Sequence, residues 1–396
     1  MLGLGALPRV VATSTAIAVL GACEVRGLIG SNADDTVGGV ASTTGNVVES
    51  TGALTTAVES GDEGHGETHH EETGVGTTED VRFDVGYRDV PELCEAPMLH
   101  SCDASDGDPW HALGLECPGS ETVDGNFVGD PTALVVHHGM LGTSGVFAPR
   151  EGERFVILST GAAGQLSMTP AELAAADPPC FPAIACPNTG HGPTPRSVLP
   201  PPLDVRRVSD KGVDCSENLD LVGTGDCSNT LYAEWLEGQS AFDYAELRMT
   251  TTVPDGVDGL AYDFAFFSAE YPTWANHSAS NNDVYVAWLD SERWTGNISF
   301  DELGNPITAN SAFLDYRDAP TMGCPGCDAP ELAGFAMEGH AGTKWLVTNA
   351  PVSAGEKMTL VFAIFDMRDE FYDSAVILDN FQWTCSSAPP FTAPSG

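Results

Sequence analysis

The segment Tyr244-Ala-Glu-Leu-Arg-Met-Thr-Thr-Thr-Val253 carries the clearest structural signal in the sequence, because apolar and polar side chains alternate along it. Ala245, Leu247 and Met249 occupy one side of this period of two, and charged or hydroxyl side chains occupy the other. Successive side chains of a β-strand point to opposite faces of the sheet. The segment therefore predicts a strand with one buried face and one wet face.

The same period recurs on both sides of this segment. Apolar side chains alternate or cluster in the ranges 155–158, 260–266, 284–288, 358–364 and 377–383. Long helical patterns are missing between these ranges, and the Pro-rich range 176–205 indicates an irregular excursion. We therefore expect an all-β fold, an antiparallel, jelly-roll-like β-sandwich with Pro-rich and disulfide-stapled loops.

The N-terminus indicates export. One basic residue, Arg9, precedes an apolar run over 10–22 that is too short to span a bilayer. The run ends in Leu20-Gly-Ala-Cys23, which resembles the lipobox of bacterial lipoproteins and implies an acylated Cys23 as the mature N-terminus. Glu24, instead of Asp, then implies sorting to the outer membrane of a Gram-negative cell, with the domain at the cell surface. The alternative is an ordinary cleaved signal that happens to end at a cysteine.

Composition divides the chain into four segments. We expect a lipoprotein signal peptide over 1–22, a disordered acidic tether rich in Gly, Ser and Thr over 23–84, a folded domain over 85–388 and a disordered tail over 389–396. With 57 acidic and 16 basic residues, the formal net charge is -41. Phosphate backbones would be repelled, so nucleic acid is excluded as a partner, and contact with the membrane is expected only through the lipid.

The cysteine content agrees with an oxidising compartment. The sequence holds 11 cysteines, and lipidation of Cys23 leaves an even number for disulfides. The disulfide candidates are Cys94, Cys102, Cys117, Cys180, Cys186, Cys215, Cys227, Cys324, Cys327 and Cys385. Spacing favours the pairs Cys180–Cys186 and Cys215–Cys227. Cys324-Pro-Gly-Cys327 has redox or zinc spacing, but a structural bridge is the better interpretation because no βαβ pattern surrounds it.

Several motifs, in order along 110–385, resemble the choice-of-anchor L domain found in surface lipoproteins of the myxobacterial type. They are Phe155-Val-Ile-Leu-Ser-Thr-Gly161, Phe266-Phe-Ser-Ala-Glu-Tyr-Pro272, Asn282-Asp-Val-Tyr285, Gly296-Asn-Ile-Ser-Phe300, Gly304-Asn-Pro306, Asp366-Met-Arg-Asp369 and Tyr372-Asp-Ser-Ala-Val-Ile-Leu-Asp-Asn-Phe381. Ala269 departs from the family, which usually has a glutamate there. The resemblance implies attachment to a surface and assigns no reaction.

Five carboxylates at predicted strand ends form a candidate metal site. They are Glu270, Asp283, Asp366, Asp369 and Asp373. If these strand ends meet at one end of the sandwich, their oxygen atoms would converge as Ca²⁺ requires. The alternative is that the acidic side chains cap local turn amides.

The sequence leaves three functions open. A non-catalytic binding or adhesion module of the cell envelope is the leading hypothesis, with a surface protein or glycan as partner. A glycan-binding module would use Tyr271, Trp274 and Trp294 as stacking platforms, unless these aromatic side chains only pad the sandwich edges. A carboxylate-dependent glycoside hydrolase is the third, because the 57 acidic residues could include its two carboxylates. Other enzyme classes are not indicated, since no nucleophile elbow, phosphate loop or dinucleotide fingerprint occurs.

Overall fold

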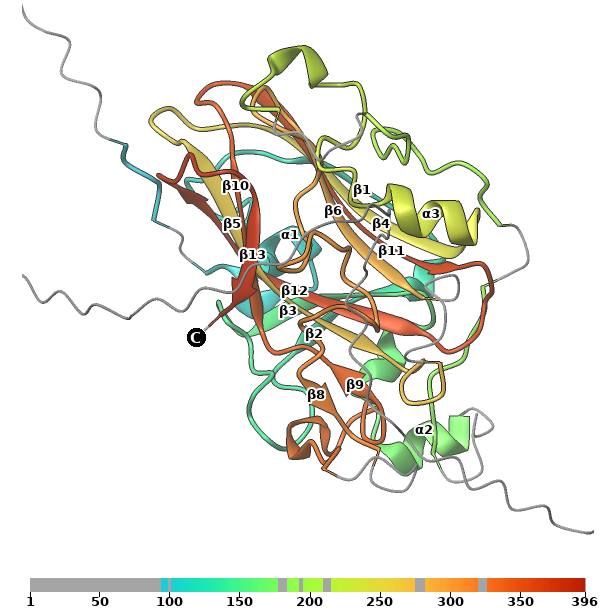
Figure 1. Cartoon of the computed structure of the whole chain (residues 1–396). Helices are drawn as coiled ribbons and strands as arrows, with labels where there is room; N and C mark the ends of the chain where they lie inside the picture. Colours follow the sequence, from blue (N-terminus) through green and yellow to red (C-terminus); the bar gives the residue numbers. More distant parts are fainter. Residues whose placement is uncertain are drawn as a thin grey trace, which may run out of the picture. The chain divides into compact units, whose positions relative to one another are not determined.

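The computed structural model describes residues 94–98, 101–176, 184–191, 195–208, 215–274, 282–319 and 326–395 (Figure 1). The chain divides into two units, Met1–Arg82 and Phe83–Gly396, and all described residues belong to the second. The expected signal peptide, Cys23 and the whole expected tether over 23–84 lie outside the described residues.

The domain is built from two antiparallel sheets. The first sheet has the order β1 (Asp124–Val128), β4 (Ala241–Thr252), β11 (Lys357–Met367), β6 (Val284–Asp290) and β7 (Thr295–Asn297). The second has the order β13 (Phe391–Pro394), β10 (Leu346–Pro351), β5 (Gly259–Ser268), β12 (Ser374–Thr384), β3 (Arg154–Ser159) and β2 (Leu134–His138). The short strand β9 (Ala341–Gly342) pairs with β5 on one side and with β8 (Tyr316–Arg317) on the other. The predicted all-β, antiparallel fold class is confirmed, and the strands that carry period-two patterns are all present.

The helices are short and lie in the connections. They are α1 (Pro109–Ala112), α2 (Pro170–Ala176), α3 (Tyr232–Gly238) and the 3-10 turns Asp103–Ser105, Pro131–Ala133, Ala163–Ser167, Leu219–Leu221 and Pro330–Leu332. Asp108 caps α1 by accepting from the Trp110 amide at 2.8 Å. Pro109 takes the first helical position, where a backbone N–H would have no acceptor within the helix.

The main core lies between the two sheets. The ring of Tyr262 on β5 meets that of Phe362 on β11 edge to face, with centroids 4.9 Å apart. Phe264 on β5 packs against Tyr285 on β6 at 5.0 Å. These pairs join strands of opposite sheets, so the two sheets pack face to face as a sandwich.

Much of the outer face of each sheet is also buried, so the expected wet face of β4 is restricted to its end, where Thr252 is exposed. Leu199 and Leu203, from the Pro-rich excursion, and Trp235 of α3 pack on the outer face of the first sheet. Glu246, expected in water, is buried there and forms an ion pair with Arg248 at 2.8 Å. A second apolar cluster covers the outer face of the other sheet. Loops thus act as additional layers of the domain.

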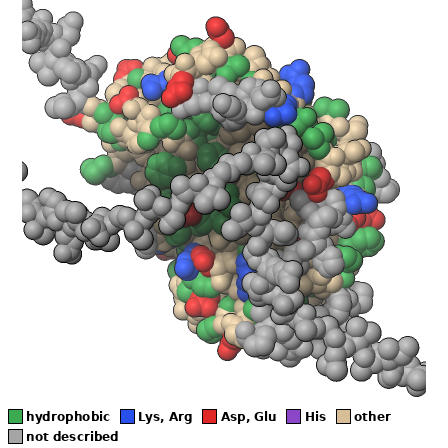
Figure 2. Space-filling view, in the orientation of Figure 1, with side chains coloured by type: hydrophobic (Ala, Val, Ile, Leu, Met, Phe, Trp, Pro, Cys, Tyr) green, Lys and Arg blue, Asp and Glu red, His purple; other side chains and the backbone are tan. Residues whose placement is uncertain are grey.

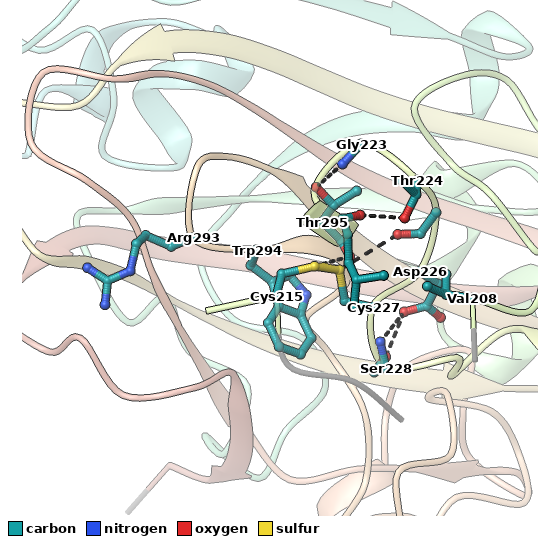
Figure 3. The surroundings of a disulfide bond; sticks show 12 residues. Val208, Cys215, Gly223, Thr224, Asp226, Cys227, Ser228, Arg293, Trp294 and Thr295 are labelled. Carbon is teal, nitrogen blue, oxygen red and sulfur yellow. Dashed lines mark hydrogen bonds between the residues drawn. A yellow bond between two sulfur atoms is a disulfide. The ribbon is translucent and has the colours of Figure 1, made fainter. Parts of the chain in front are cut away.

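Disulfides fasten these loops. The structure contains Cys94–Cys385, Cys102–Cys117 and Cys215–Cys227, the last being one of the two pairs favoured by spacing. Figure 3 shows Cys215–Cys227 beside Trp294 and Thr295, and the Cys227 amide donates to the Thr295 carbonyl at 2.7 Å. Cys186 and Cys327 are also disulfide-bonded, while Cys180 and Cys324 lie outside the described residues.

The C-terminus differs from the expected disordered tail over 389–396. Residues Phe391–Pro394 form β13 and pair with β10 at the edge of the second sheet. The Thr392 and Thr348 hydroxyls lie 2.8 Å apart, and the Ser395 amide donates to the Trp345 carbonyl at 2.8 Å. A Pro-rich end with little apolar content is ordered here because an open sheet edge offers it backbone hydrogen bonds.

Candidate functional site

The apolar core between the sheets ends in a polar layer. On β11 the inward positions Phe362 and Ile364 are followed, at the same period, by Asp366. On β5 the inward position after Phe266 is Ser268, and Glu270 lies two residues past the strand. The alternation that builds the core therefore carries carboxylates into its end.

The neighbouring strands complete this layer. Asp283 immediately precedes β6, and Ser374 is the first residue of β12. The Ser374 hydroxyl donates to the Asp283 carboxylate, and its amide donates to the Thr160 hydroxyl at 3.0 Å. Residue pairs Ser374–Ser268 and Phe365–Val284 show that these strand ends lie at one end of the sandwich, as the metal hypothesis requires.

Three carboxylates are almost fully buried in this layer. Glu270 is 2% exposed, and Asp283 and Asp366 are each 1% exposed. Burial raises the pKa of all three well above the ordinary range, because an ionised carboxylate loses its hydration. The charge of Asp366 further raises the pKa of Glu270, and Asp283 does the same to Asp366, so the three groups lie close enough to repel one another.

The cluster has unsatisfied oxygen atoms. Neither carboxylate oxygen of Asp366 makes a hydrogen bond of ordinary geometry, and neither does Oε2 of Glu270, although the Thr160 hydroxyl lies close enough to Asp366 to lower its pKa. Among the described residues, no Lys, Arg or His side chain forms an ion pair with Glu270, Asp283 or Asp366. Buried polar atoms are nearly always paired, so these oxygen atoms need an explanation.

The other two predicted carboxylates lie beside the cluster. Asp373 is buried there, where its charge raises the pKa of Asp283 and Asp366, and its carboxylate accepts from the Thr189 amide at 2.9 Å. Asp369 is partly buried, its charge raises the pKa of Glu270, and its carboxylate accepts from the Phe371 amide at 3.2 Å. That contact is the turn-capping role offered as the alternative to metal binding.

A buried histidine ties two loops beside the cluster. The ring of His340 meets the Tyr271 carbonyl at 2.8 Å and the Ala185 carbonyl at 2.9 Å. Both partners only accept hydrogen bonds, so both contacts are satisfied together only by the doubly protonated ring. Burial lowers the pKa of His340, and the two carbonyl groups oppose that shift.

The three predicted aromatic platforms are not equally accessible. Tyr271 is 6% exposed and donates to the Cys327 sulfur at 3.2 Å, and Trp294 is 4% exposed in the main core. Trp274 is 36% exposed, and its ring lies 6.4 Å from that of Tyr372. Of the three predicted side chains, Trp274 is therefore the most exposed.

Within the described ranges, no three or more His, Cys, Asp or Glu side chains are already arranged to hold a metal ion. Coordination at the cluster would require side chains to rotate toward a common point. Ser374 and Thr160, which line the cluster, were not predicted as site residues. Ser374 occupies an inward position of β12 by simple alternation, and Thr160 follows directly after the end of β3.

Comparisons with family models, curated proteins and solved structures gave no match for this chain. No helix in the described part of the chain is long and apolar enough to cross a membrane.

Figure 2 shows acidic side chains scattered over the visible face, so the buried cluster is distinct from the general acidic coat.

Proposed function

We propose that the chain is an exported surface lipoprotein, anchored in the outer membrane through acyl chains on Cys23, whose folded domain is a non-catalytic binding or adhesion module. The observation that carries this proposal is the Cys94–Cys385 disulfide, with a sequence separation of 291. Stable disulfides of this kind persist in oxidising compartments, which supports export. The lipobox-like end of the N-terminal segment supports the lipid anchor. The resemblance to choice-of-anchor L domains supports the assignment as a surface protein.

Burial of the acidic cluster favours binding over catalysis. A glycoside hydrolase needs two carboxylates that flank a substrate in an open cleft. Glu270, Asp283 and Asp366 lie under the surface, where a sugar ring has no access. The domain's acidic character likewise favours neutral or basic partners over nucleic acid.

Glycan binding is the second candidate, and the position of Trp274 favours it. Its ring and that of Tyr372 meet near 62° at the domain surface and form a small aromatic corner. Exposed aromatic faces stack on sugar rings. On a glycan array, wild-type protein would bind a defined set of sugars. Trp274→Ala would lose that binding, while its far-UV circular dichroism and Tm would stay unchanged.

The anchor is tested on full-length protein produced in a Gram-negative host. We expect intact mass analysis to show an N-terminal Cys23 bearing acyl chains, and whole-cell protease treatment to release the domain. Cys23→Ser is the matched control, because it removes the acylation site and leaves the folded domain unchanged. Wild-type protein with an unacylated N-terminus at another residue would refute the proposed anchor.

A further inference from the structure

We propose that Glu270, Asp283 and Asp366, with Asp373 beside them, bind one Ca²⁺ ion that closes the end of the sandwich. The acidic cluster is supported by a second observation, the Asp366 side chain. It is 1% exposed and points into the cluster, where neither oxygen makes a hydrogen bond of ordinary geometry and its neighbours are the Thr160 hydroxyl and the Asp283 carboxyl group. An unpaired buried carboxylate is costly, and a bound cation removes that cost.

The immediate alternative to a cation is protonation. Asp283 and Asp366 lie close enough for one proton to be shared between them, and burial of both favours the neutral form. Protons would neutralise these carboxyl groups, but they would supply no hydrogen-bond partner from the surrounding chain to Oε2 of Glu270. A divalent cation neutralises two charges at once and accepts electron pairs from all these oxygen atoms.

The donor set selects Ca²⁺ among common divalent ions. All groups that line the site carry oxygen, namely the carboxylates and the hydroxyls of Ser374 and Thr160. Ca²⁺ accepts six to eight oxygen ligands in flexible geometry, whereas Zn²⁺ prefers nitrogen and sulfur and Mg²⁺ retains several water molecules. A dry, carboxylate-rich site with flexible side chains therefore favours Ca²⁺, with some rotation of these side chains on binding.

The site would join four chain segments from both sheets. Glu270 follows β5, Asp283 precedes β6, Asp366 lies near the end of β11 and Asp373 precedes β12. An ion held between them would connect β5 and β12 of one sheet to β6 and β11 of the other. Because the carboxylates are buried, the ion would fix the loops and would not contact an external partner.

The test uses chelator-stripped full-length protein titrated with CaCl₂ in a calorimeter and followed by thermal unfolding. We expect saturable binding of one equivalent and a Tm increase of at least about 5 °C at a hundredfold excess over Kd. MgCl₂ should bind at least about tenfold more weakly. Asp366→Asn should remove the response to Ca²⁺ and raise the Tm of the metal-free protein, because it removes the cost of burying an ionisable carboxyl group whose pKa is raised.

Asp379→Asn is the control, since Asp379 is also buried but accepts from the Arg150 and Asn380 amides at 2.6 Å each. Because Asp379 is not part of the cluster, this variant should keep the full Ca²⁺ response. Unchanged melting of wild-type protein in millimolar Ca²⁺, or an equal Ca²⁺ response in Asp366→Asn, would overturn the site. Neither result affects the test of Cys23 acylation, so the two proposals fail separately.

Discussion

Removal of the Cys94–Cys385 disulfide should cost more stability than removal of any short-range bridge. A disulfide restricts the unfolded chain by an entropy that grows with the logarithm of the closed loop. A sequence separation of 291 corresponds to about 5.5 kcal/mol at 25 °C, and the separation of 15 in Cys102–Cys117 corresponds to about 3 kcal/mol. Replacing each pair by serine should therefore separate the two variants by about 2.5 kcal/mol.

The assay is urea unfolding followed by tryptophan fluorescence, with the remaining disulfides intact in both variants. The m-value should rise more in the long-loop variant, because its unfolded chain becomes more expanded. Bridges inside the long loop shorten it only slightly, and halving a loop changes its closure cost by only about 0.6 kcal/mol. If both variants lost the same stability, loop entropy would not be the main contribution of Cys94–Cys385.

Three further outcomes are expected. In chelator, stability should fall as pH rises above about 4, because the raised pKa values in the cluster leave the folded state holding protons that the unfolded state has lost. In urea titrations from pH 5 to 8, the free energy of unfolding should depend less steeply on pH in Asp366→Asn than in wild-type protein. An identical dependence would refute this cause. Burial and Glu237 raise the pKa of Glu234 to about 7, so Glu234→Gln should stabilise the domain by about 1 kcal/mol at pH 8 and by nothing at pH 5 in the same assay. Phe264→Ala should cost about 3 to 5 kcal/mol in urea unfolding, against less than about 1 kcal/mol for Phe391→Ala on edge strand β13; equal losses would contradict the assignment of the core.

The strands of the sandwich were predictable because burial of one face leaves a period of two in the sequence. The layers outside the sheets were not, since Glu246 and Arg248 form an ion pair within the domain and look in sequence like solvated residues. Leu199 and Leu203 lie among prolines, so their packing on the first sheet has no periodic signal. Local patterns report local structure, and these contacts are set by tertiary packing.

The candidate site was only partly predictable for a similar reason. Acidic residues at strand ends indicated where carboxylates could meet, and Glu270, Asp283 and Asp366 do lie together. Asp369 resembles them in sequence, yet the Phe371 amide holds it in a turn. Whether a carboxylate points into the core or caps a turn depends on the position of the strand end, which no single segment specifies.

The Cys94–Cys385 bridge also determines how the domain would bear mechanical load. A pulling force on the chain ahead of Cys94 passes across the disulfide to Cys385, directly after the end of β12. β12 is an interior strand with hydrogen-bonded neighbours on both sides, β5 and β3. Tension from a surface anchor would thus act along the middle of a sheet in shear, where many hydrogen bonds resist together, and would not peel an edge strand away one bond at a time.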